Sequence, residues 1–234
     1  MEEKVTGIVV GARDKGDFDK YLVLVTDAGR RNCIIKGVKR AASKLRFAGE
    51  LFSLCEYTLT AGHGSAVVTN AYNLSMNYEL RTDYERYLAA AAAAKLSEAF
   101  CSEQDGEFLP ELLAALEFIK ADEKLGFVRF LLRLFSRSGY ALDLALCGCG
   151  NRLGDRAFYS LAASGIACET CGGQRIRPGV LSLLRRAERG ELSEEGEDPD
   201  FYRGAVRLLS YHLANVAEGA EVLEDYLAAL KKIS

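Results

Sequence analysis

Short apolar runs separated by turn-forming residues occupy the first 80 or so positions of the chain. The runs cover residues 5–12, 21–26, 32–38, 50–60 and 66–71. Segments rich in glycine and aspartate separate them, at residues 13–17, 27–29 and 62–64. Five short strands at this spacing are typical of a small closed barrel. Because a loop rather than a long helix interrupts the strands, the pattern favours an OB-type barrel.

The pattern changes to a helical one at Thr82. The sequence Thr82-Asp83-Tyr84-Glu85 predicts a capping box, in which the Thr82 hydroxyl accepts a first-turn N–H and Glu85 reaches back. Asp122 is expected to cap a later helix. The predicted helices cover residues 82–101, 110–120, 122–139, a segment after 178, and 200–233.

These elements predict an α+β protein with two domains. Residues 1–80 are expected to form the five-stranded OB-type β-barrel, and residues 81–234 a helical domain. A cysteine-rich module at about residues 145–175 is inserted between helices of the second domain.

Composition places the chain among folded proteins. Hydrophobic residues make up 49% and charged residues 27%, enough to bury sizeable cores. No apolar run approaches the roughly 18 residues that a membrane span needs. The start, Met-Glu-Glu-Lys, lacks the basic and apolar regions of a signal peptide. We therefore expect a cytoplasmic protein with no membrane partner.

Cysteines fall into two groups. Three are scattered singly, at Cys33, Cys55 and Cys101, and we expect them to be buried. The other four form two knuckles 18 residues apart, Cys147-Gly-Cys149 and Cys168-Glu-Thr-Cys171. In a reducing compartment, such clustering indicates a metal site.

Four thiolates with no histidine suit one tetrahedral zinc ion and leave no position for water, so the site is expected to be structural. Nearby glycines give the backbone room to curl around the ion, at Gly148, Gly150, Gly172 and Gly173. Iron in a rubredoxin-like site is an alternative. Free or disulfide-bonded thiols are another.

The formal net charge of −3 conceals two charged segments of opposite sign. Residues 188–200 hold seven acidic residues and one arginine. Residues 29–48 hold no acidic residue and seven basic ones: Arg30, Arg31, Lys36, Lys39, Arg40, Lys44 and Arg46. Because such side chains contact phosphates, this stretch is a candidate DNA-binding surface. An ordinary solvated loop is the alternative.

Aromatic residues near the basic stretch could stack on bases, as in other OB barrels. The candidates are Phe18, Tyr21, Phe47 and Phe52, of which we expect the last three to pack in the core instead. Four arginines beside the knuckles could extend the DNA surface or keep the module soluble: Arg152, Arg156, Arg175 and Arg177.

Arg129, Arg133 and Arg137 recur every four residues and form a stripe on the third helix. With the apolar residues between them, they could bind an acidic, hydrophobic partner peptide. A solvated face paired with neighbouring helices is the alternative. The two histidines, His63 and His212, have no arrangement that suggests a catalytic triad, so no enzyme activity is expected.

Several segments carry a resemblance to a known family. They are Gly7 to Val10, Ile35 to Arg40, Phe52 to Leu54, Gly139 to Leu144 before Cys147, and Phe158 to Gly165 before Cys168. In this order they resemble the bacterial RecO family over almost the whole chain. The chain departs from that family in the short first knuckle, at Leu142, where a proline is usual, and at residues 217–219, where many members are basic.

The resemblance implies a non-catalytic recombination mediator that acts in recombinational repair, in the cytoplasm at the nucleoid. Such proteins bind single- and double-stranded DNA and anneal complementary strands. They work with RecR and help RecA load onto DNA coated by single-strand-binding protein, whose C-terminal tail some members bind. Two alternatives stay open: a zinc-dependent enzyme acting on nucleic acid, and a zinc-stapled interaction scaffold.

Overall fold

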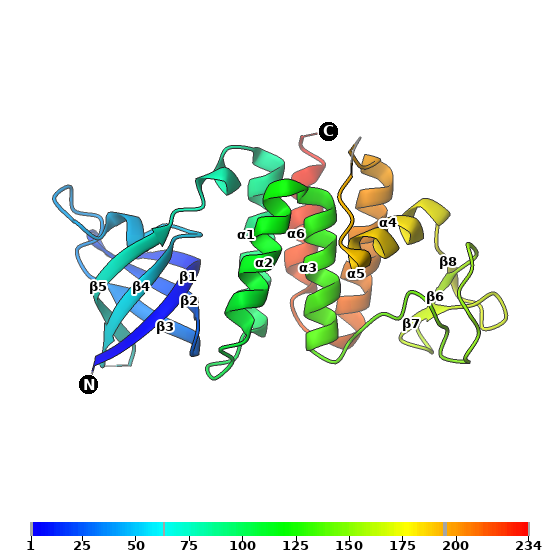
Figure 1. Cartoon of the computed structure of the whole chain (residues 1–234), viewed down its shortest axis with the longest axis horizontal. Coiled ribbons are helices and arrows are strands. Elements are labelled where there is room, and N and C mark those ends of the chain that lie inside the picture. Colours follow the sequence, from blue (N-terminus) through cyan, green and yellow to red (C-terminus); the bar gives the residue numbers. More distant parts are fainter. Residues whose placement is uncertain (1, 63, 194–195, 234) are drawn as a thin grey trace. The chain divides into compact units, whose positions relative to one another are not determined.

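The computed structural model describes residues 2–62, 64–193 and 196–233 of the chain. The chain divides into two compact units, Met1–Ala114 and Ala115–Ser234, whose elements are labelled in Figure 1. His63, together with Glu194 and Glu195 of the acidic stretch, lies outside the described residues.

A closed five-stranded barrel forms the start of the first unit (Figure 1). Its strands are β1 (Glu2–Lys15), β2 (Asp19–Thr26), β3 (Gly29–Ile35), β4 (Leu54–Thr60) and β5 (Ala66–Ser75). The neighbour order is β1-β2-β3-β5-β4, and β4 closes the barrel against β1. The β3–β5 pair is parallel, whereas the other pairs are antiparallel. The predicted OB-type barrel is therefore confirmed.

Alternating apolar positions fill the barrel. Leu22 and Leu24 of β2 point into it, together with Ile35 of β3 and Tyr57 of β4. The Tyr57 hydroxyl donates a hydrogen bond to the carbonyl of Ala48 over 3.0 Å, which satisfies a polar group inside the apolar core. The strands were predicted from short apolar runs between turn-forming residues, and these runs supply the buried side chains of the barrel.

Several strand boundaries differ from the predicted ones, and β1 and β5 extend three to four residues beyond the predicted runs. The third strand begins at Gly29 and ends at Ile35, three residues earlier than expected at each end. The fourth begins only at Leu54, because residues Arg46–Gly49 form a 3₁₀ turn, η1, and Phe52 adopts a left-handed backbone with φ of 66°. Local turn geometry therefore overrides the apolar pattern there.

Helices follow the barrel. They are α1 (Tyr84–Phe100), α2 (Phe108–Ala121), α3 (Glu123–Arg137), α4 (Pro178–Arg189), α5 (Pro199–Val216) and α6 (Ala220–Leu230). Asp122 caps α3 as predicted, and its carboxylate accepts the N–H groups of Lys124 and Leu125. The single helix expected at 200–233 is wrong: the backbone is extended at Ala217 and left-handed at Gly219, which separates α5 from α6.

The predicted capping box at Thr82 is wrong, because α1 is capped by the next residue and position 86 holds an arginine rather than Glu or Gln. Asp83, not Thr82, caps α1, and its carboxylate accepts the N–H of Arg86 over 2.9 Å. The Thr82 hydroxyl instead donates to the carbonyl of Glu79 in the 3₁₀ turn η2 (Tyr78–Arg81), which precedes the helix.

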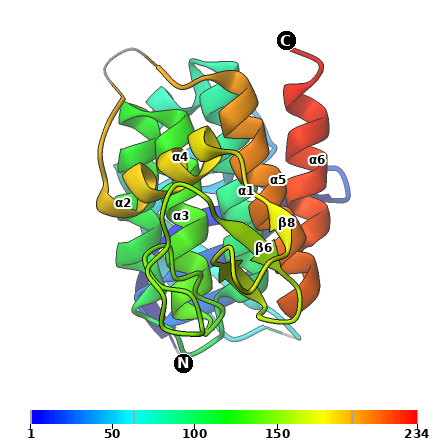
Figure 2. The same ribbon diagram turned by 90° about the vertical axis from the view of Figure 1, so that its right-hand side faces the viewer.

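In the second unit, α5 packs against α3, α4 and α6. Phe127 of α3 and Tyr226 of α6 lie in this core with ring centroids 4.6 Å apart. A small sheet, ordered β7-β6-β8, lies beside the helices (Figure 2). Its strands are β6 (Phe158–Ser160), β7 (Gly165–Ala167) and β8 (Gln174–Arg175). Among the described residues, no helix combines the length and the apolar character needed to cross a membrane.

Candidate metal centre and nucleic-acid interface

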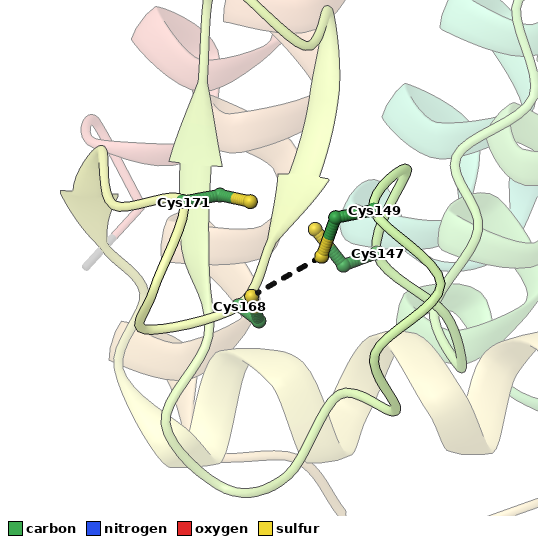
Figure 3. A group of neighbouring side chains, drawn as sticks. All are labelled: Cys147, Cys149, Cys168 and Cys171. Carbon is green, nitrogen blue, oxygen red and sulfur yellow. Dashed lines mark hydrogen bonds between the residues drawn. The ribbon is translucent and has the colours of Figure 1, made fainter.

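The four clustered cysteines converge on one point. The sulfur atoms of Cys147, Cys149, Cys168 and Cys171 all lie within 4.8 Å of one another. In Figure 3 the side chains of the two knuckles face each other across a common centre. Cys147 and Cys168 are buried, whereas Cys149 and Cys171 are exposed. We call residues 145–175 the cysteine module.

Each knuckle is a tight turn closed by a backbone hydrogen bond. The N–H of Gly150 donates to the carbonyl of Cys147 over 2.8 Å, and the N–H of Gly172 donates to that of Cys168 over 3.0 Å. Both glycines have positive φ, of 88° and 67°, which other residues adopt only at a cost. Gly173 also has positive φ, but Gly148 does not.

The sulfur geometry fits a tetrahedral metal ion. Zinc–sulfur bonds of about 2.3 Å place the sulfurs of a tetrahedron about 3.8 Å apart. The Sγ atoms of Cys149 and Cys168 are 3.6 Å apart. The C-x-C spacing of the first knuckle therefore still brings Cys149 to the cluster. Iron–thiolate sites share this donor set.

Hydrogen bonds favour negative charge on part of the cluster. The Cys171 backbone N–H and the Asn151 side-chain amide lower the pKa of Cys168 to about 6. Backbone N–H groups of Cys149 and Cys168 also lower the pKa of Cys147. Hydrogen bonds from its own thiol to the other three sulfurs raise the pKa of Cys171 to about 12. A bound cation would favour deprotonation of this last thiol as well.

Two polar contacts attach the cysteine module to the helices. The Arg185 guanidinium of α4 donates to the carbonyls of Leu144 and Leu153 over 3.1 and 2.8 Å. His212 of α5 accepts the Tyr159 hydroxyl at Nδ1 over 2.9 Å, and its Nε2 lies 2.8 Å from the carbonyl of Tyr140. These contacts leave no pattern in the sequence, because the residues that they join are 32 to 72 positions apart.

Within the basic stretch, Arg30 and Arg31 lie in β3 and contact the protein itself. Arg30 donates to the carbonyl of Glu98 over 2.7 Å. Arg31 forms an ion pair with Glu3 over 2.8 Å and donates to the carbonyl of Glu103. Residues 29–48 contain no acidic residue, but the folded barrel brings the carboxylate of Glu3 from β1 to Arg31.

Lys39 is also paired, with Asp14 over 2.7 Å, and this hydrogen bond lowers the pKa of Asp14. The other four basic side chains of the stretch are exposed, and the described part of the chain offers them no ion pair: Lys36, Arg40, Lys44 and Arg46. The Arg40 guanidinium lies 4.7 Å from the ring centroid of Phe18, whose side chain is 49% exposed. We call Phe18 and these four residues the basic loop surface.

The other aromatic candidates divide between core and surface. Phe52 is fully buried and Phe47 packs against the barrel core, as expected. Tyr21, expected in the core, is instead 40% exposed, with the Lys15 ammonium 4.4 Å above its ring. Tyr21 directly precedes Leu22, whose side chain lies in the barrel core, and successive side chains of a strand point to opposite faces, so Tyr21 points away from the interior.

The arginine stripe of α3 does not behave as one surface. Arg129 donates to the carbonyls of Ala187 and Glu188 at the end of α4, over 3.1 and 2.8 Å. Arg133 and Arg137 are exposed. Arg129 and Arg133 line a hollow of about 210 Å³ together with Leu132 and Leu142. Of the arginines of the cysteine module, Arg156 pairs with Glu169 over 3.1 Å.

Comparison with known proteins gives matches over both units. The family model described as "Recombination protein O N terminal" matches residues 1–75, and "Recombination protein O C terminal" matches residues 81–222. A DNA repair protein RecO of Rubrobacter xylanophilus is 30% identical over 232 residues, covering 93% of each chain. One from Desulfitobacterium hafniense is 29% identical over 203 residues, covering 80% of this chain and 74% of the relative.

Proposed function

The chain belongs to the RecO family of DNA repair proteins, and from this membership we propose that it is a non-catalytic recombination mediator. It binds single- and double-stranded DNA, anneals complementary strands, and helps load a RecA-type recombinase onto DNA coated by single-strand-binding protein. RecR and single-strand-binding protein are its proposed partners, and the nucleoid its place of action.

The basic loop surface is the observation that carries this proposal. Four exposed cations without internal ion pairs can neutralise phosphates, and the exposed ring of Phe18 offers a stacking face beside Arg40. Annealing needs no catalytic residue: basic side chains screen two phosphate backbones while base pairing supplies the free energy. Of the other three basic residues, Arg30 adds charge at longer range, whereas Glu3 and Asp14 neutralise Arg31 and Lys39.

Strand annealing provides the test. Complementary oligonucleotides coated with single-strand-binding protein are mixed with the chain at increasing salt, and duplex formation is followed by fluorescence energy transfer. We expect acceleration that falls with salt and is lost in the variant Lys36→Glu/Arg40→Glu. Unchanged annealing and DNA affinity in this variant at low salt would favour the scaffold alternative.

We also propose that the cysteine cluster holds one structural zinc ion. Four cysteine donors complete a tetrahedral shell, so the site lacks the open position that a catalytic zinc uses. Metal analysis of the purified protein tests this, with one zinc per chain expected and iron as the competing result. DNA cleavage that is abolished by a chelator and restored by zinc would instead support the enzyme alternative.

The hollow beside Arg133 is the proposed contact for the acidic, hydrophobic tail of single-strand-binding protein. Arg133 and Arg137 offer charge, and Leu132 and Leu142 line an apolar wall beside Arg133. Arg129 of α3 also lines the hollow, and its hydrogen bonds to the carbonyls at the end of α4 fix its position. Binding of a labelled tail peptide, weakened by Arg133→Glu but not by Lys36→Glu, tests this contact separately from DNA binding.

A further inference from the structure

A second cationic hollow lies in the helical unit, away from the arginine stripe of α3. It has a volume of about 600 Å³, within the range of ligand sites. One wall comes from β8 and the residues after it, and the other from α5 (Figure 2). The residues that matter here are Arg175, Arg177, Arg203, Arg207 and Tyr211.

Positive charge exceeds negative charge in this hollow. Its lining includes four arginines and a single carboxylate, that of Asp200. Arg203 already pairs with this carboxylate over 2.8 Å. Arg175 and Arg207 are exposed and have no ion pair within the described part of the chain. An anion entering the hollow therefore meets two arginines, Arg175 and Arg207, that no carboxylate of the described residues neutralises.

The arginine wall is held in place by the fold. Arg177 donates to the backbone carbonyl of Asp200 over 2.7 Å, and its guanidinium lies 5.5 Å from the ring centroid of Phe201. A Cβ at Gly204 would lie 2.9 Å from Nη2 of Arg177 and 2.8 Å from Cγ2 of Val180. The absence of a side chain at Gly204 thus lets Arg177 lie across α5.

An aromatic ring stands beside these cations. Tyr211 is 43% exposed, and its ring meets that of Tyr159 edge to face, with centroids 5.4 Å apart. Arg203, Arg207 and Tyr211 follow at intervals of four residues, so they share one face of α5. Cations in a row with an exposed aromatic ring are the combination that holds single-stranded nucleic acid.

We propose that this hollow is a second single-stranded nucleic-acid site, in which Arg175 and Arg207 contact phosphates and a base stacks on Tyr211. The proposal rests on the proposed function for its ligand class and adds a site in the helical unit. An acidic peptide would use the same cations, but it would gain nothing from a base-stacking face.

The variant Arg175→Gln/Arg207→Gln tests the phosphate contacts. Neither arginine has an ion pair in the described structure, so the fold should persist. Affinity for a labelled single-stranded oligonucleotide, measured by anisotropy, should fall about tenfold at low salt. The slope of log K against log salt should become shallower by about 1.4, or about 0.7 for each lost phosphate contact. The control Arg156→Gln/Arg189→Gln removes two charges of the same unit outside the hollow, and should change the slope little.

Variants of Tyr211 test whether the ligand of the hollow is a nucleic acid or an acidic peptide. Tyr211→Phe should keep the affinity, whereas Tyr211→Leu should lower it several-fold for a normal strand and not for an abasic strand of equal charge. Equal loss in the hollow and control variants would overturn the proposal. So would an oligoglutamate peptide that binds as tightly as the oligonucleotide and is equally weakened by Arg175→Gln/Arg207→Gln.

The same measurements distinguish a failure of the proposed function from a failure of the second site. If the wild-type chain binds no oligonucleotide at low salt, both are overturned. If it binds and Lys36→Glu/Arg40→Glu abolishes annealing while the hollow variants behave as wild type, the proposed function stands and the second site does not exist.

Discussion

The cysteine cluster and the basic loop surface both gather side chains of one kind, but they do so by different means. The four sulfurs meet within 4.8 Å because two turns of a few residues aim them inward. The basic residues spread over a strand and a long loop, and distant carboxylates such as Glu3 and Asp14 neutralise some of them. Ligand spacing along the chain therefore defines the first site, whereas the second depends on contacts across the barrel.

The largest expected effect is on the cysteine cluster. Cys168→Ser should remove the metal and lower the free energy of unfolding by several kcal/mol, because metal binding is coupled to ordering of the module. Metal analysis and denaturant unfolding measure the two effects. The control Cys33→Ala alters a buried thiol of the barrel core and should keep the metal. A metal-free variant as stable as wild type would show that the cluster orders nothing.

Charge reversal at the basic loop surface comes next. Lys36→Glu/Arg40→Glu should weaken DNA binding about a hundredfold at low salt, since each change replaces an attraction to phosphate by a repulsion. Arg31→Gln is the matched variant for a paired charge: it should mainly reduce stability, because it leaves Glu3 without its partner. Anisotropy and thermal unfolding compare the two. If both variants lost the same DNA affinity, cations with and without an ion pair would contribute equally to DNA binding.

The same difference explains how far each site could be predicted from the sequence. Knuckle spacing located all four cysteines, and short apolar runs between turn-forming residues located the barrel strands. The Arg31–Glu3 pair, in contrast, joins β3 to β1, which both pair with β2, so only the folded barrel brings the two side chains together. The helix cap was predicted at Thr82, one residue before its position at Asp83, because the Thr82 hydroxyl donates to a carbonyl of the turn η2 instead. Gly219 interrupts the last helix although the residues on either side of 217–219 are good helix formers.

A substitution at His212 tests how much the contact between the cysteine module and α5 contributes to the free energy of unfolding. Burial lowers its pKa below the ordinary 6.5, so the folded chain favours neutral imidazole. The unfolded chain then binds more protons as the pH falls below about 6.5, and stability present above that pH decreases. His212→Leu should remove this part of the pH dependence and cost about 1–3 kcal/mol, because the Tyr159 hydroxyl loses its acceptor. Denaturant unfolding at pH 7.5, 6.5 and 5.5 measures both, and identical pH slopes in the two proteins would exclude His212 as the source.

The smallest effect separates two arginines of one stripe. Arg129 satisfies the last carbonyls of α4 at Ala187 and Glu188, where a cation also interacts favourably with the helix dipole. Arg129→Gln should therefore cost about 1 kcal/mol of unfolding free energy. Arg133→Gln removes an exposed charge four residues later on the same helix and should cost less than about 0.5 kcal/mol. If both variants unfold at the same denaturant concentration, Arg129 contributes no more to the free energy of unfolding than the exposed Arg133 does. The distinction between arginines that contact the protein and exposed arginines would then fail in the helical unit as well.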